Sequence, residues 1–311
     1  MENIIIDEAN CIFSKVAIGS MRITDMPIED VEKLYLHAVK RGITFIDTAD
    51  VYGKGEIEEV LGKILKRNPG LRNKVYLQTK TGIMTGERGQ RYYSFEKKHI
   101  IESVNRSLDK LKTTYIDSLL LHKPDQLFDP VEVSDAFDEL YKSGKVLNFG
   151  VSNMNAPQLD LLRKYCKRPI VINQMKFSLT HTQMIDSALA VNTESEYAVD
   201  RGGNGVLDYC RYHDILIQAY SIVRSYRKGE TFINNEYHKK LNEVMERFCI
   251  KYNTNKNAIS LAWVLRHPAK IQAVIGTSNV NRLDEYLDAF NFTLSREDWY
   301  ELYAAEGKFM P

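Results

Sequence analysis

Residues 28–47 read IEDVEKLYLHAVKRGITFID and carry the pattern on which the fold prediction rests. Up to Val39, apolar side chains recur with the spacing of one helix face, and the pattern stops at Gly42, a residue type that commonly ends a helix. The apolar run from Ile43 to Ile46 then predicts a short buried strand that ends at Asp47. An amphipathic helix followed directly by a buried strand is typical of a repeating α/β unit.

The same alternation continues along the chain. Most of the apolar runs are rich in Ile, Val and Leu on both faces, which is typical of parallel strands covered by helices. Because connections between parallel strands are right-handed, eight such units fit one closed (β/α)8 TIM barrel, and 311 residues suit that barrel. We therefore expect an α/β fold in which residues 1–311 form a single domain. The eight predicted strands are 16–19, 44–47, 75–79, 116–121, 146–152, 170–174, 215–220 and 271–276.

Some segments depart from this alternation. IIIDEANCIF (4–13) reads as two apolar runs around an Asp-Glu-Ala-Asn turn, so we expect an N-terminal β-hairpin. Residues 175–204 form a polar, weakly periodic insertion. Because of it, the structure of one rim loop, at residues 180–205, is not predicted from the sequence. Helical patterns follow at 235–252 and 257–267. A doubly wound open sheet is the competing fold, but no G-x-G-x-x-G follows the first strand.

Composition excludes several classes of protein. The net charge is +1, from 42 basic and 41 acidic residues, and there is no long Lys/Arg block, so we expect no nucleic-acid partner. No segment approaches 18 consecutive apolar residues and the N-terminus lacks a signal-peptide pattern, so we expect no membrane span and no secretion. The four widely spaced cysteines favour free thiols in the reducing cytoplasm over a disulfide framework or a zinc site. The sequence does not fix the oligomeric state.

Polar residues follow three successive strands. Asp47, Lys80 and His122 come at or directly after the ends of the second, third and fourth strands, and Tyr52 lies in the loop after the second. In a (β/α)8 barrel these ends meet at the face that carries the active site, so we expect the four side chains to converge. Each alone has a simpler interpretation, as a turn cap, a packing residue, a solvated lysine or a core histidine. The joint pattern favours a catalytic site. We expect no metal, because the strand ends do not carry a cluster of His and carboxylate residues that could bind one.

The four residue types suit proton transfer to oxygen. A free phenol has a pKa of about 10 and is a poor acid at neutral pH. An ammonium group nearby stabilises the phenolate and lowers that pKa, and a carboxylate keeps the ammonium charged and in place. We therefore expect Asp47 and Lys80 to make Tyr52 a general acid, with His122 orienting a carbonyl oxygen.

Seven stretches between residues 42 and 285 resemble the aldo-keto reductase family. The resemblance is carried by GITFIDTADVYG (42–53), LQTK (77–80), LLLHKPD (119–125), GKVLNFGVSN (144–153), INQ (172–174), QAYS (218–221) and VIGTSNVNRLDE (274–285), and is strongest with a bacterial oxidoreductase branch. It implies a (β/α)8 barrel whose bottom is closed by the N-terminal hairpin, and NADPH-dependent reduction of a small aldehyde or ketone. It assigns Tyr52 as the proton donor, Asp47 and Lys80 as the residues that tune it, and His122 as the residue that positions the carbonyl.

The resemblance also implies a binding site for NADP. Ser152, Asn153 and Gln174 would hold the carboxamide, Tyr220 would stack on the nicotinamide ring, and Ser221 would begin the loop over the pyrophosphate. The cofactor site would also include Met21, Arg22, Asp47, Thr277, Ser278, Arg282 and Glu285. Many members carry a lysine where this chain has Gly276, which removes one phosphate contact but leaves Arg282. After Ser221 the chain departs from the family, and Arg224, Arg227 and Lys228 either reach the cofactor phosphates or are solvated.

The substrate is less constrained by the sequence. The loop TGIMTGERGQRYYSFEKK (81–98) lies near the expected entrance. One interpretation is that Tyr92 and Tyr93 form an aromatic wall and that Arg88 or Arg91 attracts an acidic substrate. The other is that the loop is simply exposed. A carbonyl reductase is the main hypothesis. The alternatives are a cofactor-binding regulatory subunit of the same fold, and a different barrel enzyme such as a metal-dependent hydrolase or a lyase.

Overall fold

Eight parallel strands form a closed barrel in the computed structural model, which describes residues 2–6, 11–200, 203, 205–227 and 229–311. Each strand pairs with the next along the chain, and the last pairs with the first. The predicted barrel is therefore confirmed, with strand ends that differ from the predicted ones by one or two residues. The strands are β3 (Val16–Gly19), β4 (Phe45–Asp47), β5 (Tyr76–Thr81), β8 (Ile116–Leu121), β9 (Val146–Ser152), β10 (Ile170–Lys176), β11 (Leu216–Tyr220) and β12 (Ile271–Ile275).

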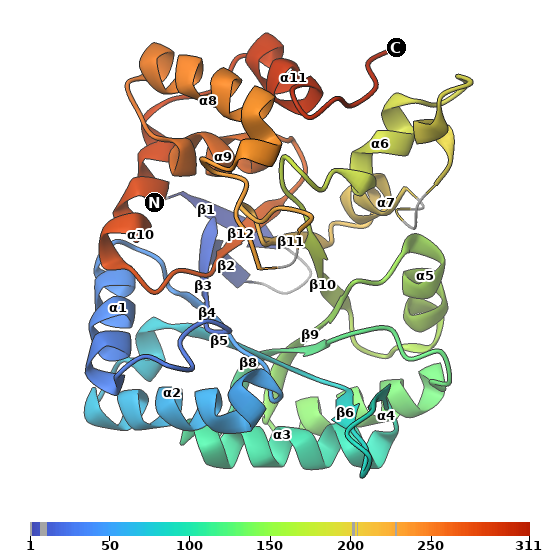
Figure 1. Cartoon of the computed structure of the whole chain (residues 1–311). Coiled ribbons are helices and arrows are strands. Elements are labelled where there is room, and N and C mark those ends of the chain that lie inside the picture. Colours follow the sequence, from blue (N-terminus) through green and yellow to red (C-terminus); the bar gives the residue numbers. More distant parts are fainter. Residues whose placement is uncertain (1, 7–10, 201–202, 204, 228) are drawn as a thin grey trace.

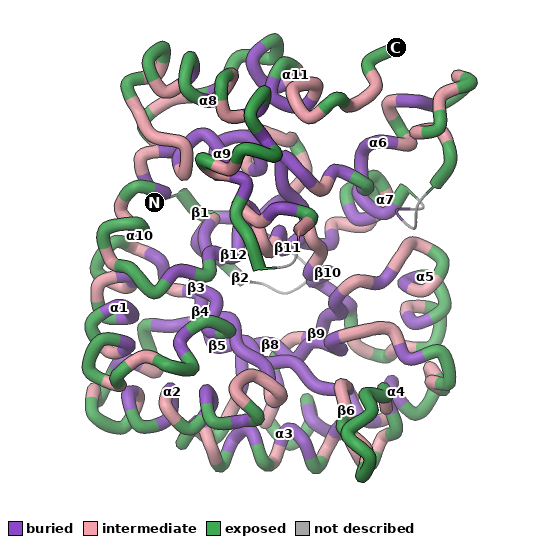
Figure 2. The backbone as a smooth tube through the Cα atoms, in the orientation of Figure 1, coloured by how far each residue is buried: buried purple, intermediate pink, exposed green. Residues whose placement is uncertain are grey.

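Helices surround the barrel (Figure 1). Their outward faces are exposed and their inner faces are buried against the strands, as the amphipathic patterns predict (Figure 2). Side-chain caps fix several starts: Asp129 accepts from the amide of Val131, and Asn155 forms a capping box with Gln158. The barrel helices are α1 (Ile28–Lys40), α2 (Glu56–Arg67), α3 (Lys97–Leu111), α4 (Pro130–Lys142), α5 (Ala156–Tyr165), α7 (Val206–Tyr212), α9 (Lys256–Leu265) and α10 (Val280–Leu287).

The N-terminal hairpin closes the barrel bottom. Strands β1 (Asn3–Ile6) and β2 (Cys11–Ser14) pair antiparallel, while the predicted Asp-Glu-Ala-Asn turn at 7–10 lies outside the described residues. The ring of Phe13 meets Phe45 and Tyr76, at the starts of β4 and β5, with centroid distances of 5.3 and 4.6 Å. The hairpin therefore covers the end of the barrel at which the strands begin, and leaves the other end for the site.

Two segments contain structure that the sequence did not predict. The insertion after β10 holds a short helix, α6 (Gln183–Leu189), and the 3-10 turn η4 (Glu196–Ala198). Residues 81–98 were treated as a loop, but they form a second antiparallel hairpin, β6 (Ile83–Thr85) and β7 (Arg91–Tyr93). Its strands have only three residues each, β6 is partly exposed and β7 is fully exposed, so they lack the long apolar run by which buried strands are recognised.

Besides α6, two further helices lie outside the ring of βα units, α8 (Lys239–Tyr252) and α11 (Arg296–Ala304). The indole of Trp299 on α11 stacks on that of Trp263 on α9 with a centroid distance of 5.0 Å. Each indole N–H donates to the other residue's backbone carbonyl, at 3.0 and 2.9 Å. Cys166, Cys210 and Cys249 are free thiols. Among the described residues, no helix is both long and apolar enough to cross a bilayer.

Close contact between α2 and α3 gives a stability prediction. A Cβ atom added to Gly62 would lie 2.0 Å from the backbone oxygen of Lys110, so Gly62→Ala must push the two helices apart. We expect a loss of about 1–3 kcal/mol in the free energy of unfolding, although the same change in a solvated helix would gain about 1 kcal/mol. Denaturant unfolding measures it. The neighbouring exposed variant Lys63→Ala should change stability by less than about 0.5 kcal/mol, and a Gly62→Ala protein as stable as the parent would contradict the packing argument.

Candidate active site

The structure brings together the four residues that the sequence placed at the rim. Asp47 ends β4, Lys80 lies in β5, His122 follows β8, and Tyr52 begins the 3-10 turn η2 (Tyr52–Gly55) after β4. The Lys80 ammonium lies 2.7 Å from the Asp47 carboxylate and donates to the Tyr52 hydroxyl at 3.3 Å. The rings of Tyr52 and His122 meet edge to face, with centroids 5.7 Å apart. Because β4, β5 and β8 are neighbours, the convergence follows from the sheet order.

Burial sets the proton affinities of this group. Burial disfavours the ammonium form of Lys80, but the charge of Asp47 and the hydrogen bonds to Asp47 and Tyr52 outweigh it, so the pKa of Lys80 is raised. Lys80 is therefore a fixed cation. The expectation that the pair makes Tyr52 more acidic than a free tyrosine was wrong for this structure, because burial raises the pKa of Tyr52 more than Lys80 lowers it. The phenol consequently holds its proton until something binds against it.

His122 is neutral in this environment. Burial, followed by the positive charges of Lys80, Lys123 and Arg91, lowers the pKa of His122 from 6.5 to about 2. Its Nδ1 atom is buried and has no hydrogen-bond partner among the described residues, which leaves Nε2 as the nitrogen able to meet a bound molecule. A neutral imidazole can donate one hydrogen bond from that nitrogen.

A ladder of glutamines inside the barrel holds Asp47. Gln78 and Gln174 each donate to Asp47 Oδ1, at 2.6 and 3.0 Å, and both donate to the side-chain oxygen of Gln218. Gln218 donates to Gln272, and Gln272 donates to the backbone oxygen of Ser14 at the bottom of the barrel. Sequence reasoning missed Gln78, Gln218 and Gln272. The available signal was an amide within each apolar strand, because buried polar side chains require partners.

Sequence reasoning also missed Asp50. Burial raises the pKa of this carboxyl group, and Ser103 Oγ donates to Asp50 Oδ2 at 2.7 Å. Its Oδ1 atom is buried and has no partner among the described residues. The charge of Asp50 is one of the influences that raise the pKa of Tyr52, so Asp50 helps to keep the phenol protonated.

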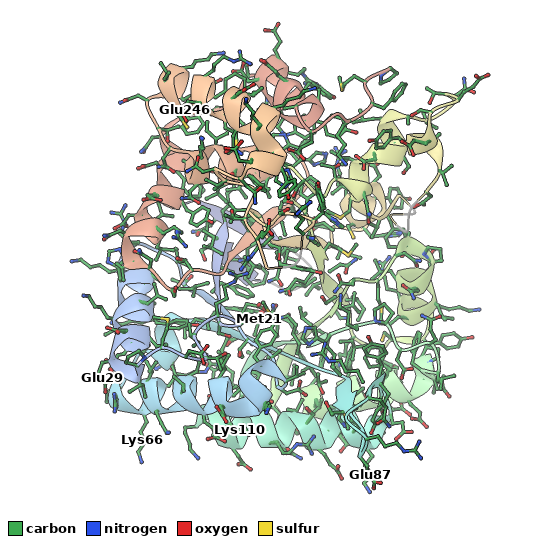
Figure 3. The ribbon with its side chains drawn as sticks, viewed as in Figure 1. Met21, Glu29, Lys66, Glu87, Lys110 and Glu246 are labelled. Carbon is green, nitrogen blue, oxygen red and sulfur yellow. The ribbon has the colours of Figure 1, made fainter. Side chains whose placement is uncertain are left out.

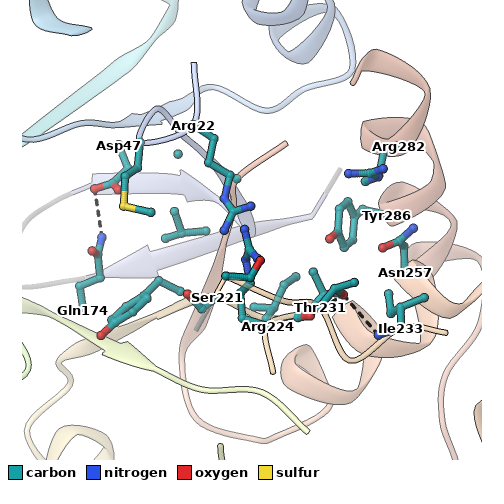
Figure 4. Close-up of a pocket in the computed structure, with 18 of the residues that line it drawn as sticks. Arg22, Asp47, Gln174, Ser221, Arg224, Thr231, Ile233, Asn257, Arg282 and Tyr286 are labelled. Carbon is teal, nitrogen blue, oxygen red and sulfur yellow. Dashed lines mark hydrogen bonds between the residues drawn. The ribbon is translucent and has the colours of Figure 1, made fainter. Parts of the chain in front are cut away.

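A cavity of about 800 Å³ extends from these residues (Figure 4). Asp47 and Gln174 lie at one end, Arg282 and Tyr286 at the other, and Arg22 and Arg224 between them. Lys80 is fully buried and does not line the cavity. The predicted site residues that do line it are Met21, Arg22, Asp47, Tyr52, His122, Ser152, Asn153, Gln174, Tyr220, Ser221, Arg224, Gly276, Arg282 and Glu285.

Near Tyr52, the cavity wall is a hydrogen-bonded set of polar side chains. Tyr220 donates to Asn153 Oδ1 at 2.8 Å, and Asn153 donates to the Ser152 hydroxyl at 2.7 Å. Ser152 in turn donates to the backbone oxygen of Gln174 at 2.9 Å. Burial raises the pKa of Tyr220 to about 12, so its phenol is a neutral donor. These contacts fix the amide of Asn153 and the ring of Tyr220 beside the group formed by Asp47, Tyr52, Lys80 and His122.

At the far end the cavity is basic. Arg282 and Arg22 have no side-chain partner among the described residues, and Arg224 bonds the backbone oxygen of Gly229. A Cβ atom added to Gly276 would lie 3.7 Å from Arg22 Cδ and Nε, so the Arg22 side chain occupies the space beside this glycine. Glu285 accepts a hydrogen bond from Asn257 at 2.7 Å. Met21 also lines the cavity, and Figure 3 shows it near the centre of the view, whereas Glu29 and Lys66 lie at the periphery.

Several predicted cofactor residues lie elsewhere. Thr277 is buried, bonds Asn279 in the turn before α10, and does not line the cavity; Ser278 does not line it either. The guanidinium of Arg227 lies 3.3 Å from the centroid of the Tyr237 ring, away from the cavity lining. Lys228 lies outside the described residues.

A buried chain of three side chains anchors the loop after β11. Ser225 Oγ lies 2.8 Å from His238 Nε2, and His238 Nδ1 lies 2.9 Å from the Glu306 carboxylate, beyond α11. Thr180 of the insertion donates to the backbone oxygen of Arg224 at 2.7 Å. The loop that borders the cavity is therefore tied both to the insertion and to the C-terminal segment. Within the described residues, no cluster of three or more His, Cys, Asp or Glu side chains could hold a metal ion.

The buried ion pair predicts a double-mutant result. Lys80→Met leaves the Asp47 carboxylate buried without its cation and should lower the free energy of unfolding by about 3–5 kcal/mol. Adding Asp47→Asn removes that charge, so the double variant should recover most of the loss. Denaturant unfolding of the three proteins checks this. A double variant no more stable than Lys80→Met would show that the charge is not what destabilises the single variant.

Comparison with known proteins gives a consistent family. The sequence model of the Aldo/keto reductase family matches residues 15–306. The chain is 33% identical over 300 residues to the 6-dehydroglucose reductase of Agrobacterium fabrum, covering 93% of each protein, and 32% identical over 302 residues to the uncharacterized oxidoreductase YcsN of Bacillus subtilis, covering 94% of each. The solved thermostable aldo-keto reductase Tm1743, in complex with epalrestat, superposes with a TM-score of 0.78 at 24% identity, covering 98% of this chain and 100% of that one. From its sequence and its barrel, the chain belongs to the aldo/keto reductase family.

Proposed function

We propose that this protein reduces an aldehyde or ketone to an alcohol with NADPH, and that Tyr52 supplies the proton. One observation carries the proposal: the Tyr52 hydroxyl, which borders the cavity, lies 3.3 Å from a buried ammonium, Lys80, which is itself paired with Asp47 at 2.7 Å. A cofactor-binding regulatory subunit would not need this group assembled. We therefore favour the enzyme.

The residues divide the proton chemistry between them. Tyr52 remains protonated because its pKa is raised, so it can donate to a carbonyl oxygen. When the proton leaves, the phenolate is stabilised by the adjacent Lys80, whose charge Asp47 maintains. His122, neutral at physiological pH, donates a hydrogen bond to the same oxygen and fixes its direction.

The cavity suits a nicotinamide dinucleotide. Ser152, Asn153 and Gln174 offer donors and acceptors for a carboxamide, Tyr220 offers a ring face, and the basic far end suits phosphates. When bound, reduced nicotinamide supplies a hydride to the carbonyl carbon and is itself oxidised, while the proton from Tyr52 completes the alcohol. The chain's own part is to hold both partners in register and to deliver that proton.

The choice of NADPH over NADH rests on arginines. The relatives include an Escherichia coli enzyme named NADH-specific methylglyoxal reductase and a Bombyx mori aldo-keto reductase solved in complex with NADP, so family membership alone allows either cofactor. Here Arg282 borders the far end of the cavity, where a 2′-phosphate would add negative charge, and Arg224 lies between the two ends. Arg22, beside Gly276, supplies a cation close to the position of the missing lysine. We propose that Arg282 grips the 2′-phosphate and Arg22 the pyrophosphate.

Replacing Tyr52 tests the proposed proton donor. Tyr52→Phe keeps the ring but removes the hydroxyl, so kcat for a simple aldehyde such as 4-nitrobenzaldehyde should fall by about 10²–10⁴-fold. The dissociation constant of NADPH, measured by fluorescence titration, should change by less than about threefold, because the cofactor is held by other residues. Turnover within tenfold of the parent would remove Tyr52 from the mechanism.

Replacing Arg282 tests the cofactor preference. NADPH should bind the parent protein more tightly than NADH, and Arg282→Met should weaken NADPH binding by about tenfold or more with a smaller effect on NADH, because a charge-assisted phosphate contact is lost. Arg296→Met is the matched control, since Arg296 is exposed on α11 and does not line the cavity. Equal affinities for both cofactors in the parent would argue against a 2′-phosphate site.

A further inference from the structure

Lys123, a lysine that lines the cavity, has no partner in the part of the chain that the structure describes. Lys123 directly follows His122 in the chain, lines the cavity with it, and is half-buried. It makes no hydrogen bond and no ion pair with any residue that the structure describes. Lys80, by contrast, is paired with Asp47, and Arg22 and Arg282, which also lack a side-chain partner among the described residues, lie further along the cavity.

A second cation approaches from the unpredicted hairpin. Arg91 lies on β7, and its side chain makes no hydrogen bond or ion pair within the described ranges. Its charge is close enough to lower the pKa of His122. Arg88, at the tip of the same hairpin, has no such influence. The rings of Tyr92 and Tyr93 are exposed and do not line the cavity, so the aromatic wall expected from the sequence is not formed.

No carboxylate of the described residues forms an ion pair with Lys123 or Arg91. Asp125 is the carboxylate closest to Lys123 in the chain, but its oxygens accept from the amides of Phe95 and Leu127 at 3.0 and 2.9 Å. No carboxylate is among the groups that shift the pKa of His122. Burial lowers the pKa of Lys123, which shows that its ammonium loses hydration without gaining a counterion. Such an arrangement is unfavourable in the free protein and is relieved by a bound anion.

We infer that the substrate carries an anionic group, a carboxylate or a phosphate, which pairs with Lys123 while its carbonyl lies at Tyr52 and His122. The inference rests on the proposed function, because it assumes that Tyr52 and His122 bind the carbonyl. Because Lys123 directly follows His122 and both side chains line the same cavity, one small substrate can reach both. Arg91 adds long-range attraction at the entrance and increases the rate of encounter.

Paired substrates isolate the anionic group. One pair is 4-carboxybenzaldehyde and its methyl ester, and the other is glyceraldehyde 3-phosphate and glyceraldehyde. The measured quantity is the ratio of kcat/KM for the charged aldehyde to that for its neutral partner, compared between proteins so that the intrinsic reactivities cancel. A high ratio for only the carboxylate pair or only the phosphate pair identifies which anion the site takes.

Variants then assign the ratio to residues. Lys123→Met should lower it by about tenfold or more, because a charge-assisted contact is lost, while Lys123→Arg should retain it. Arg91→Gln should lower the ratio by a smaller factor that disappears at high salt. Arg88→Gln is the matched control on the same hairpin and should leave the ratio within twofold of the parent.

A binding measurement separates this inference from the proposed function. Calorimetry with NADPH present measures the affinity for 4-carboxybenzyl alcohol and for its methyl ester, a combination that cannot turn over. Lys123→Met should weaken only the carboxylate. If both aldehydes of a pair are reduced but the ratio is the same in the parent and in Lys123→Met, the anion site is overturned and the reductase stands. If neither aldehyde is reduced, the proposed function fails. In the calorimetry, an equal loss of affinity for the two alcohols in Lys123→Met, or no loss for either, overturns the anion site.

Discussion

The ion pair between Asp47 and Lys80, enclosed by the barrel wall, is the constraint on which the site depends. A fully buried ammonium is tolerated only when a carboxylate and further acceptors surround it, and here Asp47 and the backbone oxygen of Thr48 supply them. The same carboxylate accepts from Gln78 and Gln174, so the charge is fixed to the interior of the barrel down to Ser14. Lys80, held in this way, donates to the Tyr52 hydroxyl at 3.3 Å and so helps to fix that hydroxyl at the edge of the cavity.

The cavity separates two kinds of chemistry along its length. Beside Tyr52, the side chains of Ser152, Asn153 and Tyr220 form a neutral, hydrogen-bonded wall, which suits an amide and an aromatic ring. At the far end Arg282 has no side-chain partner among the described residues, which suits phosphate. The loop after β11 borders this cavity and is held by Ser225, His238 and Glu306. The C-terminal segment thus stabilises a wall of the site although it contributes no residue that lines the cavity.

Sequence predicted the elements whose signal is apolar. The eight barrel strands are runs of Ile, Val and Leu buried on both faces, and they were recognised within one or two residues. The hairpin β6–β7 was missed because its short strands are partly or fully exposed, and the glutamine ladder was missed because single amides in strands carry no periodicity. The raised pKa of Tyr52 was predicted with the wrong sign, because the neighbouring charge is visible in a sequence and the extent of burial is not. Thr277 does not line the cavity because its hydroxyl is used in a local turn, and its contact with the cofactor stays a prediction.

The most direct test of the central claim is the titration of Tyr52 itself, with no substrate or cofactor present. Tyrosines labelled with ¹³C at the ring carbon Cζ report ionisation by NMR, and the Tyr52→Phe spectrum assigns the resonance. Lys80 lowers the pKa of Tyr52 more than Asp47 raises it, so the resonance should titrate at higher pH in the stable Asp47→Asn/Lys80→Met variant than in the parent. An unchanged or lower titration midpoint in that variant would contradict the claim that the buried pair controls the phenol.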